Sequence, residues 1–274
     1  MKTDLHEFES KEYDSGEDII MVKKSKKLKT IKTVKTIKTK LELQLLKKCL
    51  NESERIIEIG VDEAGRGPLF GRVYTAAVIL PKDDSFDLSK VKDSKKFHSK
   101  KKIEEAAQYI KDNALAWHIS YADEKKIDEI NILQATQLSM HESILETTKK
   151  FNSSQKLQDR LEKRDYDFNL LIDGNYFNPI THFNKTTNKI ETIPYMTVEG
   201  GDNKYASIAA ASILAKVERD KYIEDLCINN PELSEFYGID SNKGYGAKKH
   251  LDGIKEHGIT IWHRRSFAPC KHYI

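Results

Sequence analysis

The sequence predicts an α/β domain in which helices flank one central mixed β-sheet, with a helical segment at the C-terminal end. Apolar, β-branched segments of strand length come first along the chain, and longer segments with helical spacing interleave with them later. The chain has 274 residues, of which 38% are hydrophobic, so it can bury a substantial core. These observations favour one large domain with a tail over several small domains.

Short apolar segments rich in Val, Ile and aromatic residues are expected to form strands. They lie at residues 56–63, 72–80, 115–122, 167–174 and 193–201. Helical spacing marks residues 99–113, 128–150 and 207–226. Residues 41–50 also show helical spacing and are expected to begin the ordered region, whereas the charged residues 151–166 fit either an insertion or a helix extension.

Residues 1–40 are expected to be a disordered, low-complexity extension, and residues 41–274 the folded domain. The extension is acidic at first, and its residues 23–40 then hold nine lysines and no acid. The stretch KTIKTVKTIKT repeats every three residues, a period that fits neither a helix nor a strand. The extension is therefore either a solvated tail or a non-specific tether for nucleic acid.

Composition also limits the class of protein. The three cysteines are far apart and form no CxxC pair, so neither a disulfide framework nor a cysteine-based zinc site is expected. The sequence shows no apolar run of about 20 residues and no signal-peptide pattern, so we expect a soluble, cytoplasmic protein without a membrane partner. Residues 242–272 are rich in Lys and Arg and form a candidate phosphate-facing stretch.

The stretch IIEIGVDEAGRGPLFG, residues 56–71, runs from a predicted strand into two adjacent acids and then a glycine-rich loop. Its glycines approach the spacing of a dinucleotide-binding loop, but the third comes one position late, Pro68 lacks an amide hydrogen, and no clean amphipathic helix follows. Asp62 and Glu63 would also repel a bound pyrophosphate. We therefore favour a site in which metal ions lie between these carboxylates and a phosphate.

Two further acids are placed to complete such a site. Asp173 ends the predicted strand 167–174, and Asp202 precedes the helix at 207–226. Enzymes that hydrolyse phosphodiesters hold two divalent cations ~3.5–4 Å apart with oxygen ligands. Taken singly, each of these acids fits a turn or a helix cap better. Their joint spacing makes a site shared with Asp62 and Glu63 the better interpretation.

Six stretches of the sequence resemble, in chain order, the motifs of the ribonuclease HII family, the type 2 ribonucleases H. They are GVDEAGRGPLFG, VKDSKK, LIDGN, GGD followed by SIAAASILAKVERD, KGYGAKKHLDGIKEHGIT, and HRRSF. The resemblance covers residues 56 to about 269. It implies a ribonuclease H-like fold, a requirement for Mg²⁺ or Mn²⁺, and hydrolysis of the RNA strand of RNA–DNA hybrids to 5′-phosphate products. It also implies incision beside single ribonucleotides embedded in duplex DNA.

The resemblance assigns roles by motif position. The four metal-binding acids fall on Asp62, Glu63, Asp173 and Asp202. The glycine loop at Gly65, Arg66 and Gly67 is similar to a strand-end motif that meets the nucleic-acid backbone and the ribose 2′-hydroxyl. Tyr245 matches a tyrosine that recognises the RNA-to-DNA junction, and Ser94 and Lys95 match minor phosphate contacts.

Three positions depart from the family pattern. Phe70 and Arg72 stand where small residues or proline are usual, and Ala247 stands where a hydroxyl residue is common. None of them replaces an acid, so they bear on the fit of the substrate and leave the reaction type unchanged.

Other residues carry weaker signals. Asp220 lies well inside the helix 207–226 and is expected to be structural. The spacing of His250, His257 and His263 could suggest zinc, but no cysteine or fourth ligand joins them. We expect His263 and the neighbouring Arg264 and Arg265 to face phosphate or the domain's own carboxylates, and Trp117 and Trp262 to be core residues.

The leading functional interpretation is a monomeric, metal-dependent endonuclease. The alternative is a catalytically silent nucleic-acid-binding protein that keeps the fold and grips its partner with the lysine tail. Because the four carboxylates are intact, we favour the enzyme.

Overall fold

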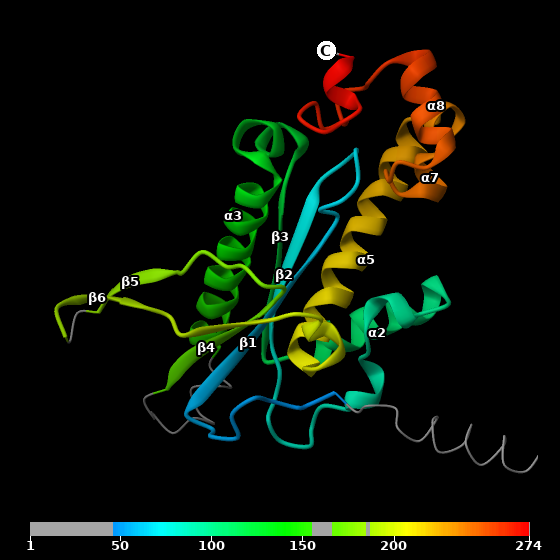
Figure 1. Ribbon diagram of the computed structural model, residues 1–274. Coiled ribbons are helices and arrows are strands. Elements are labelled where there is room, and N and C mark those ends of the chain that lie inside the picture. Colours follow the sequence, from blue (N-terminus) through cyan, green and yellow to red (C-terminus); the bar gives the residue numbers. More distant parts are fainter. Residues whose placement is uncertain (1–45, 155–165, 185–186, 274) are drawn as a thin grey trace, which may run out of the picture. The chain divides into compact units, whose positions relative to one another are not determined.

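A five-stranded mixed sheet in the order β3-β2-β1-β4-β7 forms the centre of the fold (Figure 1). The computed structural model describes residues 46–154, 166–184 and 187–273. The extension predicted at residues 1–40 and most of the charged stretch predicted at residues 151–166 lie outside the described residues.

The central strand β1 (Ile56–Ala64) has one antiparallel and one parallel neighbour. It pairs antiparallel with β2 (Val73–Ile79) and parallel with β4 (Asp167–Asp173). The strand β3 (Ala116–Ala122) pairs antiparallel with β2, and β7 (Tyr195–Val198) pairs parallel with β4. These five strands match the five predicted segments, and the mixed sheet confirms the predicted α/β fold class.

Helices cover both faces of this sheet, as Figure 1 shows. The helix α3 (Glu124–Ser153) lies on one face, where Ile59 and Val61 pack against Met140 and Ile144. The helices α2 (Lys100–Asn113) and α5 (Ala206–Asn229) lie on the other face. The alanine-rich start of α5 approaches β1 so closely that a Cβ atom on Gly60 would lie 2.2 Å from the carbonyl carbon of Ser207.

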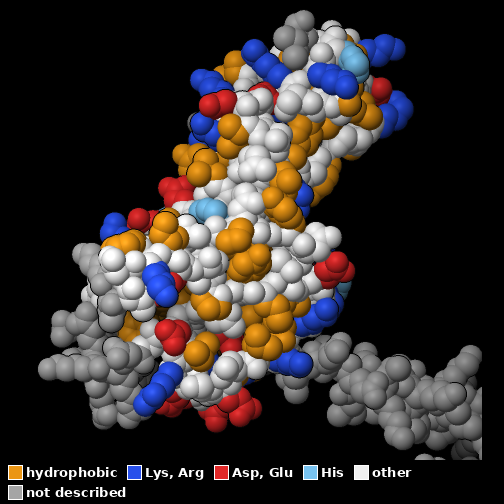
Figure 2. All heavy atoms as spheres, turned by 60° about the vertical axis from the view of Figure 1, so that its left-hand side comes forward, with side chains coloured by type: hydrophobic (Ala, Val, Ile, Leu, Met, Phe, Trp, Pro, Cys, Tyr) orange, Lys and Arg blue, Asp and Glu red, His pale blue; other side chains and the backbone are white. Residues whose placement is uncertain are grey.

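Short helices follow α5 and form the predicted helical C-terminal segment: α6 (Glu232–Tyr237), α7 (Ile239–Asn242) and α8 (Lys248–His257). They share a separate apolar core with Leu69 and Phe70 of the loop after β1. In Figure 2, several Lys and Arg side chains gather near the top of the view, the height at which Figure 1 shows α7, α8 and the C-terminus. Single 3₁₀ turns complete the described structure at Leu88–Lys90, Ser94–Lys96, Gly201–Asn203 and Cys270–His272.

Three local features differ from the sequence-based expectation. Residues 46–50, the described part of the segment predicted to be helical, form no helix: Lys47 makes an isolated bridge with Tyr205, and its backbone bonds to Lys204 and Ala206. The helix α3 contains a break at Asn131, whose φ is 67°. The strands β5 (Thr181–Asn184) and β6 (Lys189–Thr192) form a hairpin between the predicted strands 167–174 and 193–201, where no strand was predicted.

Both tryptophans pack against apolar clusters, as predicted. Trp117 packs against the core under α2 and α5, and Trp262 packs against the core of the C-terminal segment. None of the described helices combines the length and the apolar composition that a membrane span needs.

Candidate active site

Asp62 lies near the C-terminal end of β1 and points to the side of the sheet that α5 covers. Side chains alternate along a strand, so Asp62 shares its face with Gly60, the residue against which α5 packs. Its carboxylate accepts hydrogen bonds from the Ser212 hydroxyl of α5 and, at 2.7 Å, from the Glu63 backbone N–H. Only 5% of Asp62 is exposed, so the protein fixes its position in a nearly dry environment.

Asp173 lies beside Asp62 because β1 and β4 run parallel. The last pair in the register between β1 and β4 is Val61 with Ile172. The next residues of the two strands, Asp62 and Asp173, therefore lie side by side on the same face of the sheet. The backbone N–H of Gly201 donates to Asp173 Oδ1 at 2.7 Å. A parallel strand pair thus brings together two carboxylates that are 111 positions apart in the numbering of the sequence.

Asp202 is held in the 3₁₀ turn Gly201–Asn203, immediately before α5. It is buried, its Oδ1 accepts from Asn203 Nδ2 at 3.1 Å, and its Oδ2 lies 3.6 Å from Lys95 Nζ. Asp93 joins the same group, because Asn203 Nδ2 also lies 3.3 Å from Asp93 Oδ2. Asp202 therefore adjoins Asp173 through the turn and connects with the VKDSKK segment through Lys95.

The carboxylates repel one another. Burial raises the pKa of Asp62 well above its ordinary value, and the charges of Asp173 and Glu63 raise it further. Burial also raises the pKa of Glu63 against the opposing effect of Arg66, and burial together with the charge of Asp202 raises the pKa of Asp173. Such a cluster is stabilised by any cation that binds between its members.

Lysines already compensate part of this charge. Burial lowers the pKa of Lys95, but the carboxylates of Asp202 and Asp93 outweigh burial and leave it raised. Ser94, which is predicted to contact phosphate, is largely buried, and its hydroxyl lies 3.0 Å from that of Ser212. Ser94 therefore reaches the site as a support for Ser212 and Asp62, whereas the Lys95 side chain is 82% exposed and accessible to a ligand.

A cleft of about 460 Å³ opens above these carboxylates. Its lining includes the predicted residues Asp62, Glu63, Gly65, Ser94, Lys95, Asp173 and Tyr245. The lining also includes residues that the sequence analysis did not assign to the site: Ser212, Lys216, Arg219, Asp220, Ser241, Asn242 and Lys243. Arg66, Gly67 and Asp202 are not among the lining residues.

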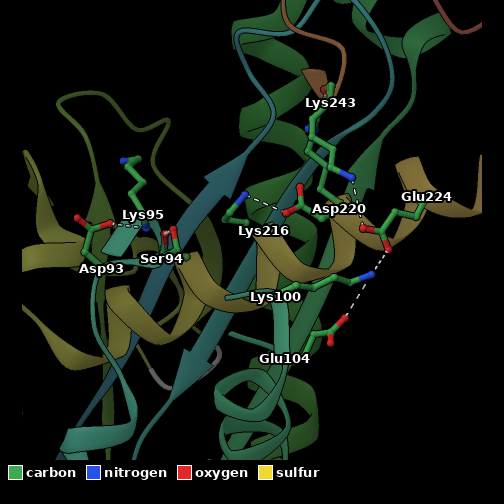
Figure 3. Close-up of polar contacts among 11 residues, drawn as sticks. Asp93, Ser94, Lys95, Lys100, Glu104, Lys216, Asp220, Glu224 and Lys243 are labelled. Carbon is green, nitrogen blue, oxygen red and sulfur yellow. Dashed lines mark hydrogen bonds and ion pairs between the residues drawn. The ribbon is translucent and has the colours of Figure 1, made fainter. Parts of the chain in front are cut away.

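The residues missed by sequence come mainly from one face of α5. Ser212, Lys216 and Asp220 follow one another at four-residue spacing, which puts them on one side of a helix. Lys216 Nζ lies 2.9 Å from Asp220 Oδ2, and Figure 3 shows this pair beside Lys243, which lies 3.3 Å from Glu224. Asp220 thus faces the cleft as the partner of Lys216. The helical period could have predicted this face once Ser212 was placed against Asp62.

Two buried arginines organise the glycine loop. Gly65 has a φ of 95°, and a Cβ atom there would lie 2.2 Å from Arg219 Nε. The fully buried Arg264 donates to the carbonyl oxygens of Gly65 at 2.6 Å and Arg66 at 2.9 Å. In a trans peptide the N–H points away from the C=O, so the N–H groups of Arg66 and Gly67 are turned away from Arg264.

This arrangement corrects the prediction for the HRRSF motif. Arg264 and His263 do not face phosphate, because both are buried and bond to the protein itself. Arg265 donates its backbone N–H to Asp128 at 2.9 Å. His263 and Arg264 thus act in the protein interior, which sequence reasoning missed because the positive charge of the motif suggested an exposed surface. Arg265 is exposed, and its bond to Asp128 agrees with the predicted alternative of a carboxylate of the domain itself.

Tyr245 lines the same cleft as the carboxylates and is half exposed. A Cβ atom on Gly67 would come within 3.5 Å of the Tyr245 ring, so the tyrosine lies directly beside the glycine loop. Arg66 is also half exposed, and its Nη1 lies 3.4 Å from Glu63 Oε1. Gly65 and Tyr245 therefore line the cleft, and Arg66 and Gly67 lie next to them.

The donor chemistry of this site fits a hard divalent cation, since carboxylate oxygens are the ligands that such ions prefer. Within the described part of the chain, no three His, Cys, Asp or Glu side chains are grouped so that they could hold a metal ion as they stand. Asp173 is turned to the Gly201 N–H, and Asp202 is turned to Asn203. Each of these hydrogen bonds uses one carboxylate oxygen, so Asp173 and Asp202 both keep acceptor capacity that a cation could use.

The mixed sheet, with acids at the ends of two adjacent parallel strands, places the chain among the ribonuclease H-like α/β proteins. A family model described as Ribonuclease HII matches residues 59–270. The chain belongs to the ribonuclease HII family, which comprises metal-dependent ribonucleases H.

Individual relatives agree with this membership. A protein named Ribonuclease HII from Bacteroides thetaiotaomicron is 44% identical over 212 residues, which cover 77% of this chain and 90% of that protein. A Ribonuclease HII from Neisseria meningitidis is 41% identical over 219 residues, which cover 80% and 96%. The crystal structure of the ribonuclease H2 from Pyrococcus horikoshii shares the fold, with a TM-score of 0.54 at 23% identity over 79% of this chain and 96% of that one.

Proposed function

We propose that this chain is an endonuclease that hydrolyses the RNA strand of RNA–DNA hybrids and incises duplex DNA beside embedded ribonucleotides. The observation that carries the proposal is the adjacency of Asp62 and Asp173 on parallel strands beside a lysine-lined cleft. Neighbouring buried carboxylates destabilise a fold unless a cation joins them, so this adjacency favours divalent-metal catalysis over a structural role. Membership of the ribonuclease HII family supports the same reaction.

Asp62, Glu63, Asp173 and Asp202 would hold Mg²⁺ or Mn²⁺, which activates water and stabilises the leaving oxygen in phosphodiester hydrolysis. The chain's own groups prepare this site. Ser212 and the Glu63 N–H fix the Asp62 carboxylate, and the Gly201 N–H fixes Asp173. Lys95, whose raised pKa keeps it charged, is placed to attract the phosphate of the substrate.

In this proposal, the glycine loop and the neighbouring Tyr245 distinguish ribose from deoxyribose. The 2′-hydroxyl both donates and accepts hydrogen bonds, and it is the group by which a protein distinguishes RNA from DNA. The N–H groups of Arg66 and Gly67, turned away from Arg264, can reach it, and the Tyr245 ring can pack on the neighbouring sugar where that sugar lacks the hydroxyl. All of these groups belong to one chain, so we propose that a monomer is sufficient for catalysis.

The test is cleavage of a labelled DNA duplex that holds one ribonucleotide, and of a uniform RNA–DNA hybrid, with Mg²⁺ or Mn²⁺. Asp62→Asn and Asp173→Asn remove a charge while keeping the shape of the side chain. Each is expected to lower kcat/KM by more than the ~10–100-fold typical of residues that merely support a metal ligand. Asp220→Asn is the matched control, because Asp220 lines the same cleft but pairs with Lys216, and it should keep most of the activity.

Near-normal turnover by either of the first two variants would remove that acid from the metal site. Binding of the hybrid without cleavage under all metal conditions would favour the alternative, a catalytically silent nucleic-acid-binding protein. Equal losses in Asp220→Asn and Asp62→Asn would extend the metal site to α5.

A further inference from the structure

Two buried histidines bond to each other next to Tyr245, which lines the cleft. His250 belongs to α8 and His263 to the HRRSF motif, and both are at most 1% exposed. Their Nε2 atoms lie 3.0 Å apart. Neither side chain lines the cleft, so the proposed reaction leaves this pair without a role.

The outer partners of the pair determine where its protons lie. His263 Nδ1 accepts a hydrogen bond from the Thr260 backbone N–H at 2.9 Å, so in neutral His263 the proton is on Nε2. That Nε2–H donates to His250 Nε2, which places the His250 proton on Nδ1. His250 Nδ1–H then donates to the Tyr245 carbonyl oxygen at 2.9 Å. The bonds run in one direction, from Thr260 through both rings to Tyr245.

Burial keeps both rings in this neutral form. It lowers the pKa of His250, and burial together with the nearby His250 lowers the pKa of His263 to about 3. A proton added to the pair would place hydrogens on both Nε2 atoms, and the central hydrogen bond would be lost. The pair is therefore a fixed connection at neutral pH.

The same pair contacts the glycine loop. The rings of Phe70 and His263 meet edge to face with centroids 5.1 Å apart, and the backbones of these two residues form an antiparallel bridge. The Leu69 N–H donates to the Gly244 carbonyl at 2.8 Å, immediately before Tyr245. Phe70, one of the departures from the family pattern, is thus the contact between the loop and the histidines.

We propose that the His250–His263 pair is a positioning unit that holds the Tyr245 turn against the glycine loop, and that it thereby sets the preference for a single ribonucleotide over a uniform hybrid. This inference rests on the proposed role of Tyr245 at the RNA-to-DNA junction. The histidines act through the Tyr245 backbone and touch no substrate.

The test compares His250→Asn with His250→Gln in the full-length protein. The Asn amide can occupy the place of Nδ1 and keep the bond to the Tyr245 carbonyl, whereas the longer Gln amide reaches His263 and leaves that carbonyl without its side-chain donor. The measured quantity is kcat/KM on the single-ribonucleotide duplex divided by kcat/KM on the hybrid. His250→Gln should lower this ratio by about fivefold, the effect of one lost hydrogen bond, and His250→Asn should largely preserve it.

Amide hydrogen exchange gives a second readout that does not depend on activity. The Ala247 N–H donates to the Tyr245 carbonyl at 2.8 Å, so its exchange reports on this turn. We expect faster exchange at residues 245–247 in His250→Gln than in wild type or His250→Asn. If His250→Gln does not fold, His263→Asn, which can still accept from Thr260 but no longer reaches His250, should shift both readouts in the same direction.

Unchanged exchange in His250→Gln, or equal changes in the Asn and Gln variants, would overturn the positioning role. Tyr245→Ala separates this inference from the proposed function. If Tyr245→Ala lowers the ratio while His250→Gln does not, the inference alone is wrong. If Tyr245→Ala leaves the ratio unchanged, the proposed recognition of the RNA-to-DNA junction by Tyr245 is wrong. In that case, faster exchange in His250→Gln would still support the positioning of the Tyr245 turn by the histidines.

Discussion

The raised pKa values of three site carboxylates predict an unusual dependence of stability on pH for the metal-free protein. The three are Asp62, Glu63 and Asp173. All three have a pKa raised above the ordinary value, so the folded state binds more protons than the unfolded state between the ordinary and the raised values. Their contribution to stability is present at low pH and is lost as pH rises through the raised pKa values. In the presence of a chelator, these groups should therefore make the free energy of unfolding fall with rising pH above about 4.

Asp62→Asn isolates this effect, because the amide cannot ionise. The difference in free energy of unfolding between Asp62→Asn and wild type, measured by urea denaturation, should favour the variant at pH 8 and shrink towards pH 4. Addition of Mg²⁺ or Mn²⁺ should stabilise wild type more than the variant. A difference that does not change with pH would mean that Asp62 ionises without penalty.

Individual acids were predictable from sequence, whereas their supports were not. Asp62 and Asp173 lie near the ends of two strands, and the β-branched composition of both strands makes them predictable from the sequence. Ser212 and Lys216 belong to an alanine-rich helix with no strong polar face, so only the packing of α5 on Gly60 shows which side meets the site. His263 and Arg264 were misassigned because charge alone does not indicate burial.

At the scale of elements, the glycine loop offers a matched pair of substitutions. An alanine at position 65 would have to adopt a left-handed φ of 95°, and its Cβ would lie 2.2 Å from Arg219 Nε. At position 67 the atom nearest to an added Cβ is 3.5 Å away, in the Tyr245 ring. Gly65→Ala should destabilise the fold by about 1–3 kcal/mol. Gly67→Ala should fold normally and weaken cleavage of the hybrid. Thermal denaturation and kcat/KM of both variants check this, and equal stability would contradict the conformational role of Gly65.

The start of α8 carries a second prediction. Ala247 is the N-cap residue, with the extended backbone that caps adopt (φ −67°, ψ 157°), and its side chain can accept no hydrogen bond. Ala247→Ser would supply an acceptor for the free N–H groups of the first turn. We expect a gain of about 1 kcal/mol in the free energy of unfolding, measured with denaturant. Ala247→Val, which also lacks a capping oxygen, is the control and should give no gain.

Helices with a strong hydrophobic period were predictable from the sequence. Segments whose structure depends on backbone pairing with other parts of the chain were not. Residues 99–113 and 207–226 carry their helical signal locally, so α2 and α5 appear where expected. Residues 46–50 have helical spacing, but the Lys47 backbone bonds to Lys204 and Ala206 and the segment forms no helix. The β5–β6 hairpin has short polar strands whose exposed Phe183 and Ile190 give no core-facing alternation.

At the scale of the whole molecule, positive charge is concentrated in two parts of the sequence. Residues 23–40 hold nine lysines and no acid, and residues 242–272 hold the second concentration. In the described structure, many lysines of the folded domain pair with acids, as Lys100 does with Glu104 and Glu224 in Figure 3. Paired lysines attract phosphate less strongly than unpaired ones. The lysine-rich extension is therefore the stronger candidate for non-specific binding, in which neither the base sequence nor the kind of sugar matters.

Deletion of residues 1–40 is therefore expected to weaken binding to any duplex without changing which bond is cut. Each lysine that neutralises a phosphate releases a counterion, and the slope of log K against log salt changes by about 0.9 for each such contact. The truncated protein should show a shallower slope by several units, with equal losses of affinity for DNA and hybrid duplexes, because the selective groups lie in the cleft. A variant with the nine lysines replaced by glutamine is the matched control, since it keeps chain length and should reproduce the deletion. Identical affinity and salt slope in all three proteins would contradict the tether and assign the extension to a role outside substrate binding.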